Sequence, residues 1–266
     1  MLKYIVLNKE VGQTPLQVVQ EYKRQNPEFA DIPMAYAGRL DPMASGKLLV
    51  LIGEECKQQE KYHALDKKYR FEVMFGSSSD TGDILGLIDW QKTPILETEQ
   101  IKKVTNKLLG KVSLPYPSFS SRTVKGKPLH MWTLENRLHE IEIPNSETTI
   151  YDLKLIGMRT IPAEKLYQAV LDRINSIPRV TEKNKELGRD FRRDEVRLSW
   201  QNWLEYHKGK NIPIATFDCV ASSGTYMRSL AEEIAKELGS SGLAYSIHRQ
   251  IIGKYWKFGL WWKKFD

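Results

Sequence analysis

Residues 36–52 of this 266-residue chain read YAGRLDPMASGKLLVLI, a loop punctuated by glycine and followed by an apolar run. The run at 48–52 predicts a strand with both faces buried. Asp41 stands before Pro42, and the residue before a proline is held near extended backbone. The flanking glycines permit a tight turn and the close approach of another segment. The loop therefore presents Asp41 as a fixed, accessible carboxylate that can act as a nucleophile. The alternative is a helix N-cap followed by its first residue.

The segments around this loop predict both strands and helices. Residues 4–7 form a short apolar run, and residues 151–156 and 215–220 are further strand candidates. Residues 68–75 alternate with period two, which indicates a strand with one buried side. That side carries Tyr69, Phe71, Val73 and Phe75, and the other carries Arg70, Glu72 and Met74.

Helical signals lie between these strands. Thr14 can cap a helix in which Leu16, Val19 and Tyr22 recur at helical spacing. Residues 99–109 predict a second helix, and residues 223–225 open a third that ends at Gly239. Strands and helices alternate irregularly, so the predicted fold class is α+β with a mostly antiparallel mixed sheet flanked by helices.

Residues 157–213 differ in composition and predict a charged helical insertion. One helical pattern runs from residue 163 to about 176, and the second runs from about 194 to 209. The apolar positions of the two patterns are Leu166, Val170, Ile174, Val196, Trp200, Trp203 and Leu204. A helical hairpin inserted between two strands explains the pattern, with 1–156 and 214–266 forming one domain around it.

The composition indicates which classes of binding partner the protein favours. Apolar residues make up 41% of the chain, and the formal net charge is +7. The excess of basic residues suggests an anionic partner, nucleic acid before membrane. No apolar run approaches the ~20 residues of a membrane span. The two cysteines form no Cys-x-x-Cys pair, which fits a reducing, cytoplasmic setting.

The sequence lacks the motifs of several common catalytic and metal-binding sites. The chain has no Gly-x-x-x-x-Gly-Lys-Ser/Thr loop and no Gly-x-Ser-x-Gly elbow. His139-Glu140 lacks the second zinc-ligating histidine, because residue 143 is isoleucine, and no metal site is predicted. Asp80 and Asp83 do not fit the spacing of a calcium loop and are interpreted as turn and capping residues.

The loop at 36–50 resembles the active-site loop of the TruB family of tRNA pseudouridine synthases, through its Gly-x-Leu-Asp-Pro core and the following Ser-Gly-x-Leu. Four further segments resemble family motifs in the right order. They are residues 8–12, residues 67–70 with 79–83, residues 117–121 with 126–127, and residues 219–230, which read CVASSGTYMRSL. The resemblance covers 4–156 and 214–252, and it implies a sheet of the pseudouridine synthase type.

The resemblance implies a reaction and its catalytic residues. A flipped-out uridine, expected at position 55 of the tRNA T-loop, would be isomerised to pseudouridine without a cofactor, with Asp41 as nucleophile. Arg228 is similar to the family arginine that pairs with this carboxylate, and a bidentate guanidinium would fix its direction. Tyr69 is similar to the tyrosine that stacks under the base and handles a proton. The alternatives are a solvated arginine and an ordinary strand tyrosine.

RNA contacts are expected at Lys9, Tyr36, Arg39, Lys127 and Tyr226. Lys9, Arg39 and Lys127 are candidates for phosphate contacts, although Lys9 and Lys127 could equally be solvated surface lysines. Tyr36 replaces the usual family histidine.

Two further regions are RNA-binding candidates in place of the PUA-like domain that often follows the family's catalytic core and is not recognised here. One is the insertion. The other is residues 249–266, where basic and aromatic residues alternate. Core packing is the alternative for Trp256 and Phe258, and we expect it to hold for these two.

The predicted partner is the tRNA T-arm. We expect a monomer with no obligatory protein partner and no membrane contact. The competing hypothesis is an RNA chaperone or guide-RNA subunit that kept the fold without the reaction; a related one is a synthase acting on another RNA.

Overall fold

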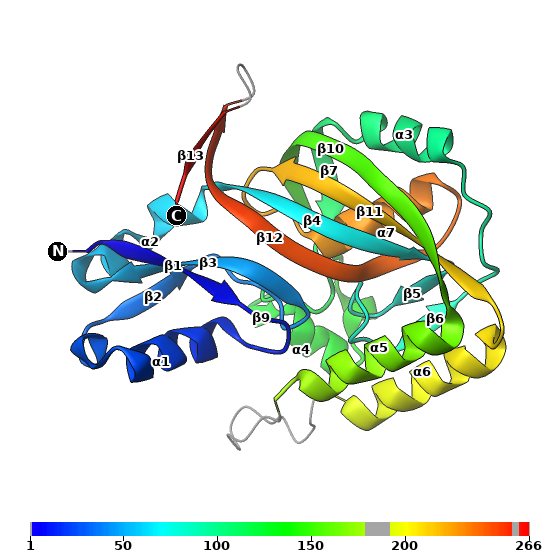
Figure 1. Ribbon diagram of the computed structural model, residues 1–266, viewed down its shortest axis with the longest axis horizontal. Coiled ribbons are helices and arrows are strands. Elements are labelled where there is room, and N and C mark those ends of the chain that lie inside the picture. Colours follow the sequence, from blue (N-terminus) through cyan, green and yellow to red (C-terminus); the bar gives the residue numbers. More distant parts are fainter. Residues whose placement is uncertain (1, 179–191, 257–260, 266) are drawn as a thin grey trace.

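The structure is a computed structural model that describes residues 2–178, 192–256 and 261–265. Nine strands of the described chain form one twisted sheet in the order β1-β3-β12-β4-β11-β10-β7, with β2 on β3 and β13 on β12 (Figure 1). These strands are β1 (Tyr4–Lys9), β2 (Met34–Ala37), β3 (Ala44–Ile52), β4 (Asp66–Phe75), β7 (Gly110–Pro115), β10 (Asn145–Pro162), β11 (Asn211–Ala221), β12 (Gly242–Trp256) and β13 (Trp261–Lys264). Two small hairpins pair β5 (Ser77–Ser79) with β6 (Ile88–Trp90), and β8 (Thr123–Val124) with β9 (Lys127–Pro128).

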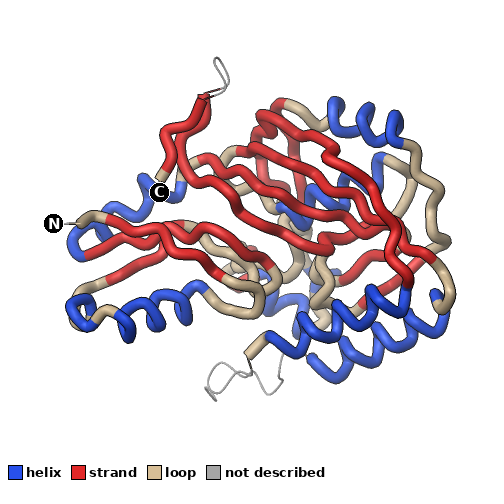
Figure 2. The backbone as a smooth tube through the Cα atoms, viewed as in Figure 1, coloured by secondary structure: helices blue, strands red, loops and turns tan. Residues whose placement is uncertain are grey.

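Helices flank this sheet (Figure 2). They are α1 (Pro15–Gln25), α2 (Gln59–His63), α3 (Thr98–Lys107), α4 (Leu129–Leu134), α5 (Ala163–Ser176), α6 (Arg193–His207) and α7 (Met227–Glu237). Every strand pair in the described sheet is antiparallel except β12 with β3. The predicted α+β class with a mostly antiparallel sheet is therefore confirmed. No helix in the described ranges is long and apolar enough to cross a membrane.

The parallel pair explains one glycine of the 36–52 stretch. Gly46 lies opposite Arg249 across β3 and β12, and its φ is +108°. A Cβ at this position would lie 2.8 Å from the backbone nitrogen of Arg249 and closer still to its carbonyl oxygen. Only glycine allows β12 to approach β3 here.

Helix α1 begins as predicted, with Thr14 and Gln17 forming a capping box. Of its residues at helical spacing, Val19 is buried together with Val18, whereas Leu16 is 47% exposed. Met74 was expected on the exposed side of β4 and is completely buried. Strand β4 lies in the middle of the sheet, and its C-terminal half is packed on both faces.

The insertion is a helical hairpin, as predicted, but it has no core of its own. Helices α5 and α6 lie side by side beneath the sheet (Figure 1). Their buried Leu166, Val170 and Trp200 belong to the main hydrophobic cluster. Strands β10 and β11 also continue to Pro162 and from Asn211, so the sheet extends into the range assigned to the insertion. Most of the expected linker between the helices, 179–191, lies outside the described residues.

Candidate active site

Asp41 lies in the turn between β2 and β3. Its backbone carbonyl accepts a hydrogen bond from Ala44 at 3.0 Å, and Gly12 donates to the carbonyl of Pro42 at 2.9 Å. The Asp41 side chain keeps 37% exposure. No helix begins at this residue, so the N-cap alternative is wrong, and the carboxylate is fixed and accessible as predicted.

Lys9 holds this turn from beneath. It is completely buried, and its Nζ donates to the carbonyl of Ala44 at 2.5 Å and to that of Glu10 at 3.0 Å. Burial lowers the pKa of Lys9 to about 8, although the nearby Asp41 carboxylate opposes the shift. The expected phosphate contact is wrong for Lys9, because its buried ammonium donates hydrogen bonds to backbone carbonyls in and near the loop that carries Asp41.

Arg228, in the first turn of α7, is the partner of Asp41. Its Nε lies 2.9 Å from Oδ2 of Asp41, and its side chain is 5% exposed. The remaining guanidinium nitrogens donate to the carbonyls of Thr81 at 2.7 Å and Phe119 at 3.3 Å. The predicted pair is present, and the solvated alternative is wrong. The expected bidentate geometry is not found, because Nε lies beside Asp41 while Nη1 and Nη2 donate to backbone carbonyls.

A second carboxylate shares this arginine. Asp83 is buried, and its Oδ2 lies 3.8 Å from Nε of Arg228. Its other oxygen accepts from Thr81 Oγ1 at 2.8 Å and from the backbone of Leu85 at 2.9 Å. Burial raises the pKa of Asp83 to about 6, against the opposing charge of Arg228. Burial would by itself lower the pKa of Arg228, but Asp41 and Asp83 hold it above its usual range.

Glu232 lies one helical turn after Arg228 on α7. Burial raises the pKa of Glu232 to about 7, with Arg228 lowering it and Asp83 raising it. Three carboxylates therefore surround one guanidinium, and they cannot all be ionised at low cost. Asp83 was predicted only as a turn residue, and Glu232 was not among the predicted site residues. The position of Glu232 four residues after Arg228 on the predicted helix was the available signal.

Glu232→Gln is expected to raise the free energy of unfolding at pH 8. The pKa of Glu232 rises from 4.5 to about 7 on folding, so its ionisation lowers the free energy of unfolding. This destabilisation is complete above pH 7 and fades as the pH falls from 7 towards 4.5. Urea unfolding at pH 8 and pH 5 measures this, and the advantage of the variant should shrink at pH 5. Glu233→Gln, at the next position, is the control and should change stability by no more than about 0.5 kcal/mol. A Glu232→Gln protein that is no more stable than the parent at pH 8 contradicts the prediction.

Tyr69 and Arg249 form the floor of the site. They face each other across β4 and β12, at 9% and 1% exposure. Arg249 donates from Nε to the carbonyl of Lys47 at 2.7 Å and from Nη1 to that of Arg39 at 3.2 Å. Burial raises the pKa of the Tyr69 phenol, although the Arg249 guanidinium opposes the shift. Arg249, assigned to the RNA-binding tail, is instead a buried residue of the site.

These side chains line a cavity of about 970 Å³. The predicted residues that the structure brings to it are Asp41, Tyr69, Arg228, Tyr36, Arg39 and Tyr226. The volume is ample for a nucleoside, since ligand pockets span roughly 300–1,000 Å³. Lys127 does not line it. Its Nζ forms an ion pair with Glu135 at 2.6 Å and lies over the Trp132 ring, so a phosphate would have to displace both.

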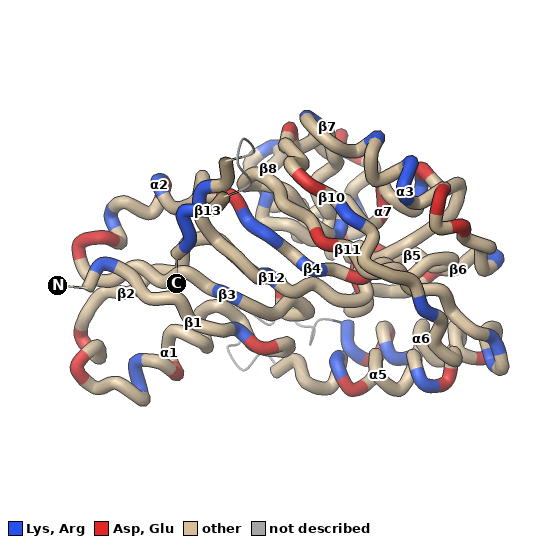
Figure 3. The backbone as a smooth tube through the Cα atoms, turned by 45° about the horizontal axis from the view of Figure 1, so that its top comes forward, with Lys and Arg blue, Asp and Glu red and all other residues tan. Residues whose placement is uncertain are grey.

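The chain's C-terminal hairpin carries an exposed aromatic pair. Trp256 of β12 and Trp261 of β13 stack with ring centroids 4.1 Å apart, and they are 36% and 52% exposed. Core packing is therefore wrong for Trp256, and Phe258 lies outside the described residues. Figure 3 shows basic positions on β13, where Lys263 pairs in register with Lys254 of β12.

Comparison with known proteins identifies a family. The family model described as TruB family pseudouridylate synthase (N terminal domain) matches residues 30–170. The chain is 29% identical over 251 residues to a tRNA pseudouridine synthase B of Caldicellulosiruptor saccharolyticus, covering 94% of this chain and 67% of that protein. It is 28% identical over 274 residues to tRNA pseudouridine synthase 4 of Saccharomyces cerevisiae, covering 91% of this chain and 68% of that protein.

The fold is similar to a chain in the crystal structure of a Cbf5-Nop10-Gar1 complex. The TM-score is 0.55 at 15% identity, over 94% of this chain and 49% of that one. The chain thus spans about two thirds of the two relatives and about half of this structural neighbour.

Proposed function

Because the chain belongs to the TruB family of pseudouridylate synthases, we propose that it isomerises a uridine of tRNA, at position 55 of the T-loop, with Asp41 as the nucleophile. One observation carries the proposal: a carboxylate paired with a buried guanidinium at 2.9 Å lines a cavity that can hold a nucleoside. The relatives named above are tRNA pseudouridine synthases, which supports tRNA as the substrate.

The reaction breaks the N1–C1′ bond and joins C5 to C1′, so no atom enters or leaves apart from the proton that moves from C5 to N1. An ionised Asp41 suits attack on the sugar, attack on the base, or stabilisation of a developing positive sugar. Arg228 supports each of these by holding the carboxylate in one direction while its own position is fixed by the carbonyls of Thr81 and Phe119.

Tyr69 is proposed to support the flipped base. Its raised pKa favours the neutral phenol, whose ring can stack under the base and whose hydroxyl can donate a hydrogen bond. Flipping costs a few kcal/mol of lost stacking, which such contacts offset.

Arg39 is the proposed phosphate contact nearest to Asp41. Its side chain lines the cavity and makes no hydrogen bond or ion pair with any residue that the structure describes. Tyr226, beside Asp41 and stacked edge-on against Tyr116, and Tyr36 are proposed to line the path of the RNA.

The decisive experiment maps pseudouridine in an unmodified tRNA transcript after incubation with the purified chain. Conversion at position 55 supports the proposal. Conversion only elsewhere, or only in another RNA, corrects the substrate. Conversion only when a guide RNA is added favours the guide-RNA subunit, and binding without any conversion favours the chaperone.

The tryptophan pair predicts a second RNA contact. Replacing Trp256 and Trp261 together by alanine is expected to weaken tRNA binding by about tenfold or more, because stacking on a base contributes about 1–3 kcal/mol. Fluorescence anisotropy with labelled tRNA measures this, and kcat at saturating tRNA should not change. A variant with phenylalanine at both positions keeps the stacking surfaces and should bind within about threefold of the parent. Unchanged affinity of the alanine variant would remove the hairpin from the RNA-binding surface.

The insertion also stays a proposed RNA contact. Deleting 157–213 is a poor test, because it would remove core residues such as Trp200 and Trp203. The salt dependence of tRNA binding should instead be compared after neutralising exposed basic residues of the hairpin.

A further inference from the structure

One side chain of the helical insertion, Arg192, contacts the two loops whose carbonyls hold Arg228. We propose that Arg192, at the start of α6, is a positioning residue that clamps the two loops holding Arg228, so that the insertion sets the rate of the catalytic step. The proposal rests on the proposed function, because its measured quantity is pseudouridine formation.

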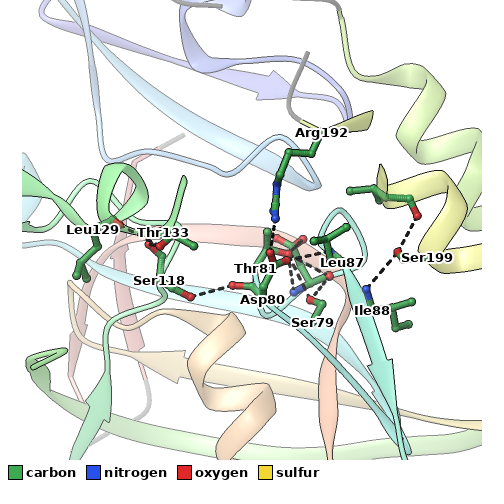
Figure 4. A network of polar contacts seen from close by, with 12 residues as sticks. Ser79, Asp80, Thr81, Leu87, Ile88, Ser118, Leu129, Thr133, Arg192 and Ser199 are labelled. Atoms are coloured by element: carbon green, nitrogen blue, oxygen red, sulfur yellow. Dashed lines mark hydrogen bonds and ion pairs between the residues drawn. The ribbon is translucent and has the colours of Figure 1, made fainter. Parts of the chain in front are cut away.

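Arg192 contacts both loops directly. Its Nη1 lies 2.5 Å from Oδ2 of Asp80 (Figure 4). Its guanidinium lies over the ring of Phe119, 4.6 Å from the ring centroid. The side chains of Arg192 and Asp80 are 12% and 30% exposed, so this ion pair is partly shielded from water and is screened less than a fully exposed pair.

The same two loops supply the carbonyls that hold Arg228. Thr81, whose carbonyl accepts one of these hydrogen bonds from Arg228, follows Asp80 in the chain, and the carbonyl of Phe119 accepts the other. Ser118 joins the loops by donating to the Asp80 carbonyl at 2.8 Å (Figure 4). Arg192 therefore contacts Phe119, whose carbonyl accepts from Arg228, and Asp80, the residue before Thr81, whose carbonyl also accepts from Arg228.

The backbone of Arg192 is itself held in place. Its φ is +56°, in the left-handed region that a non-glycine residue adopts at a cost. Val196 donates to its carbonyl at 2.9 Å. The next residue, Arg193, is buried and donates to the carbonyls of Ile174 at 2.6 Å and Ile177 at 2.9 Å. The end of α5 thus fixes the start of α6, and with it the direction from which Arg192 approaches.

A second cavity continues from this contact to the catalytic pair. Its volume is about 580 Å³, and it is lined by Arg192, Ile174 and Val196 of the insertion as well as by Asp41 and Arg228. The insertion and the catalytic residues are therefore walls of one cavity.

Arg192→Gln is expected to lower kcat about tenfold while leaving KM for tRNA within about twofold, since the variant loosens Arg228 without removing an exposed phosphate contact. Asp80→Asn should reproduce this loss, and the double variant should be no slower than either single one, because both remove the same clamp. Arg192→Lys keeps the charge and should recover part of kcat.

Arg197→Gln is the matched control. Arg197 lies on the same helix but pairs with Asp194 at 3.0 Å and Asn175 at 2.7 Å, both within the insertion. The kcat of the Arg197→Gln variant should equal that of the parent protein.

Three results would overturn the clamp: unchanged kcat in Arg192→Gln, a rise in KM alone, or additive losses in the double variant. If Arg192→Gln does not fold at the assay temperature, Asp80→Asn decides, since parental kcat in that variant also rejects the clamp. An inactive parent protein is a different outcome, because it rejects the proposed function before any variant is compared.

Discussion

Asp41→Asn is expected to lower pseudouridine formation by about 10⁴-fold or more, the size of loss seen when an enzyme loses its nucleophile. Asparagine has the same shape and leaves the turn intact, because Lys9 and Gly12 hold its backbone neighbours rather than the carboxylate. The amide is neutral, so it neither attacks an electrophilic carbon nor stabilises a positive sugar. Single-turnover assays, with the enzyme in excess over tRNA and above the Kd, isolate the chemical step.

The tRNA affinity of Asp41→Asn should stay within a few-fold of the parent, because the residue acts on the reacting atoms and not on the phosphates. Asp194→Asn removes an almost fully exposed carboxylate of α6 and is the control; it should keep full activity. Turnover by Asp41→Asn at a rate near that of the parent would refute the assignment of the nucleophile.

Arg228→Gln is expected to lower both activity and stability. The variant leaves Asp83 buried without its cation, and breaking a buried pair costs roughly 3–5 kcal/mol. We expect the free energy of unfolding to fall by about 3 kcal/mol, the lower end of this range, because the Asp41 side chain is partly exposed to water. We expect kcat to fall by at least about 10²-fold, since Asp41 loses the group that directs it. Urea unfolding at pH 8 and single-turnover kinetics measure the two effects separately.

A second substitution separates these effects. Adding Asp83→Asn to Arg228→Gln removes the stranded charge and should recover part of the stability at pH 8, while activity stays low because Asp41 is still undirected. Removing the Arg228 charge raises the pKa of Asp83 above its parental value of about 6, so the stability loss of Arg228→Gln should shrink as the pH falls from 8 towards 6 and Asp83 takes up a proton. A variant as stable as the parent at pH 8, or a double variant with restored activity, would contradict this account.

Local sequence patterns and motifs predicted the longer strands and helices and the pairing of Asp41 with Arg228. The apolar run at 48–52 lies within β3, the helical spacing of the insertion predicted α5 and α6, and the motifs brought Asp41 and Arg228 into one site. These features could be predicted because periodicity, capping residues and motif order are local properties of the chain.

The burial and the ion-pair partners of the charged side chains could not be predicted from local patterns, because they depend on the tertiary fold. Lys9 and Arg249 look like any other basic residues in the sequence, yet the pairing of β1 and β12 with β3 buries both beneath the Asp41 turn. Asp83 appears as a turn residue until α7 places Arg228 beside it, and Arg192 reaches Asp80 only because the insertion folds back onto the core. Burial and ion pairing depend on which distant segments meet, and a linear pattern does not contain that information.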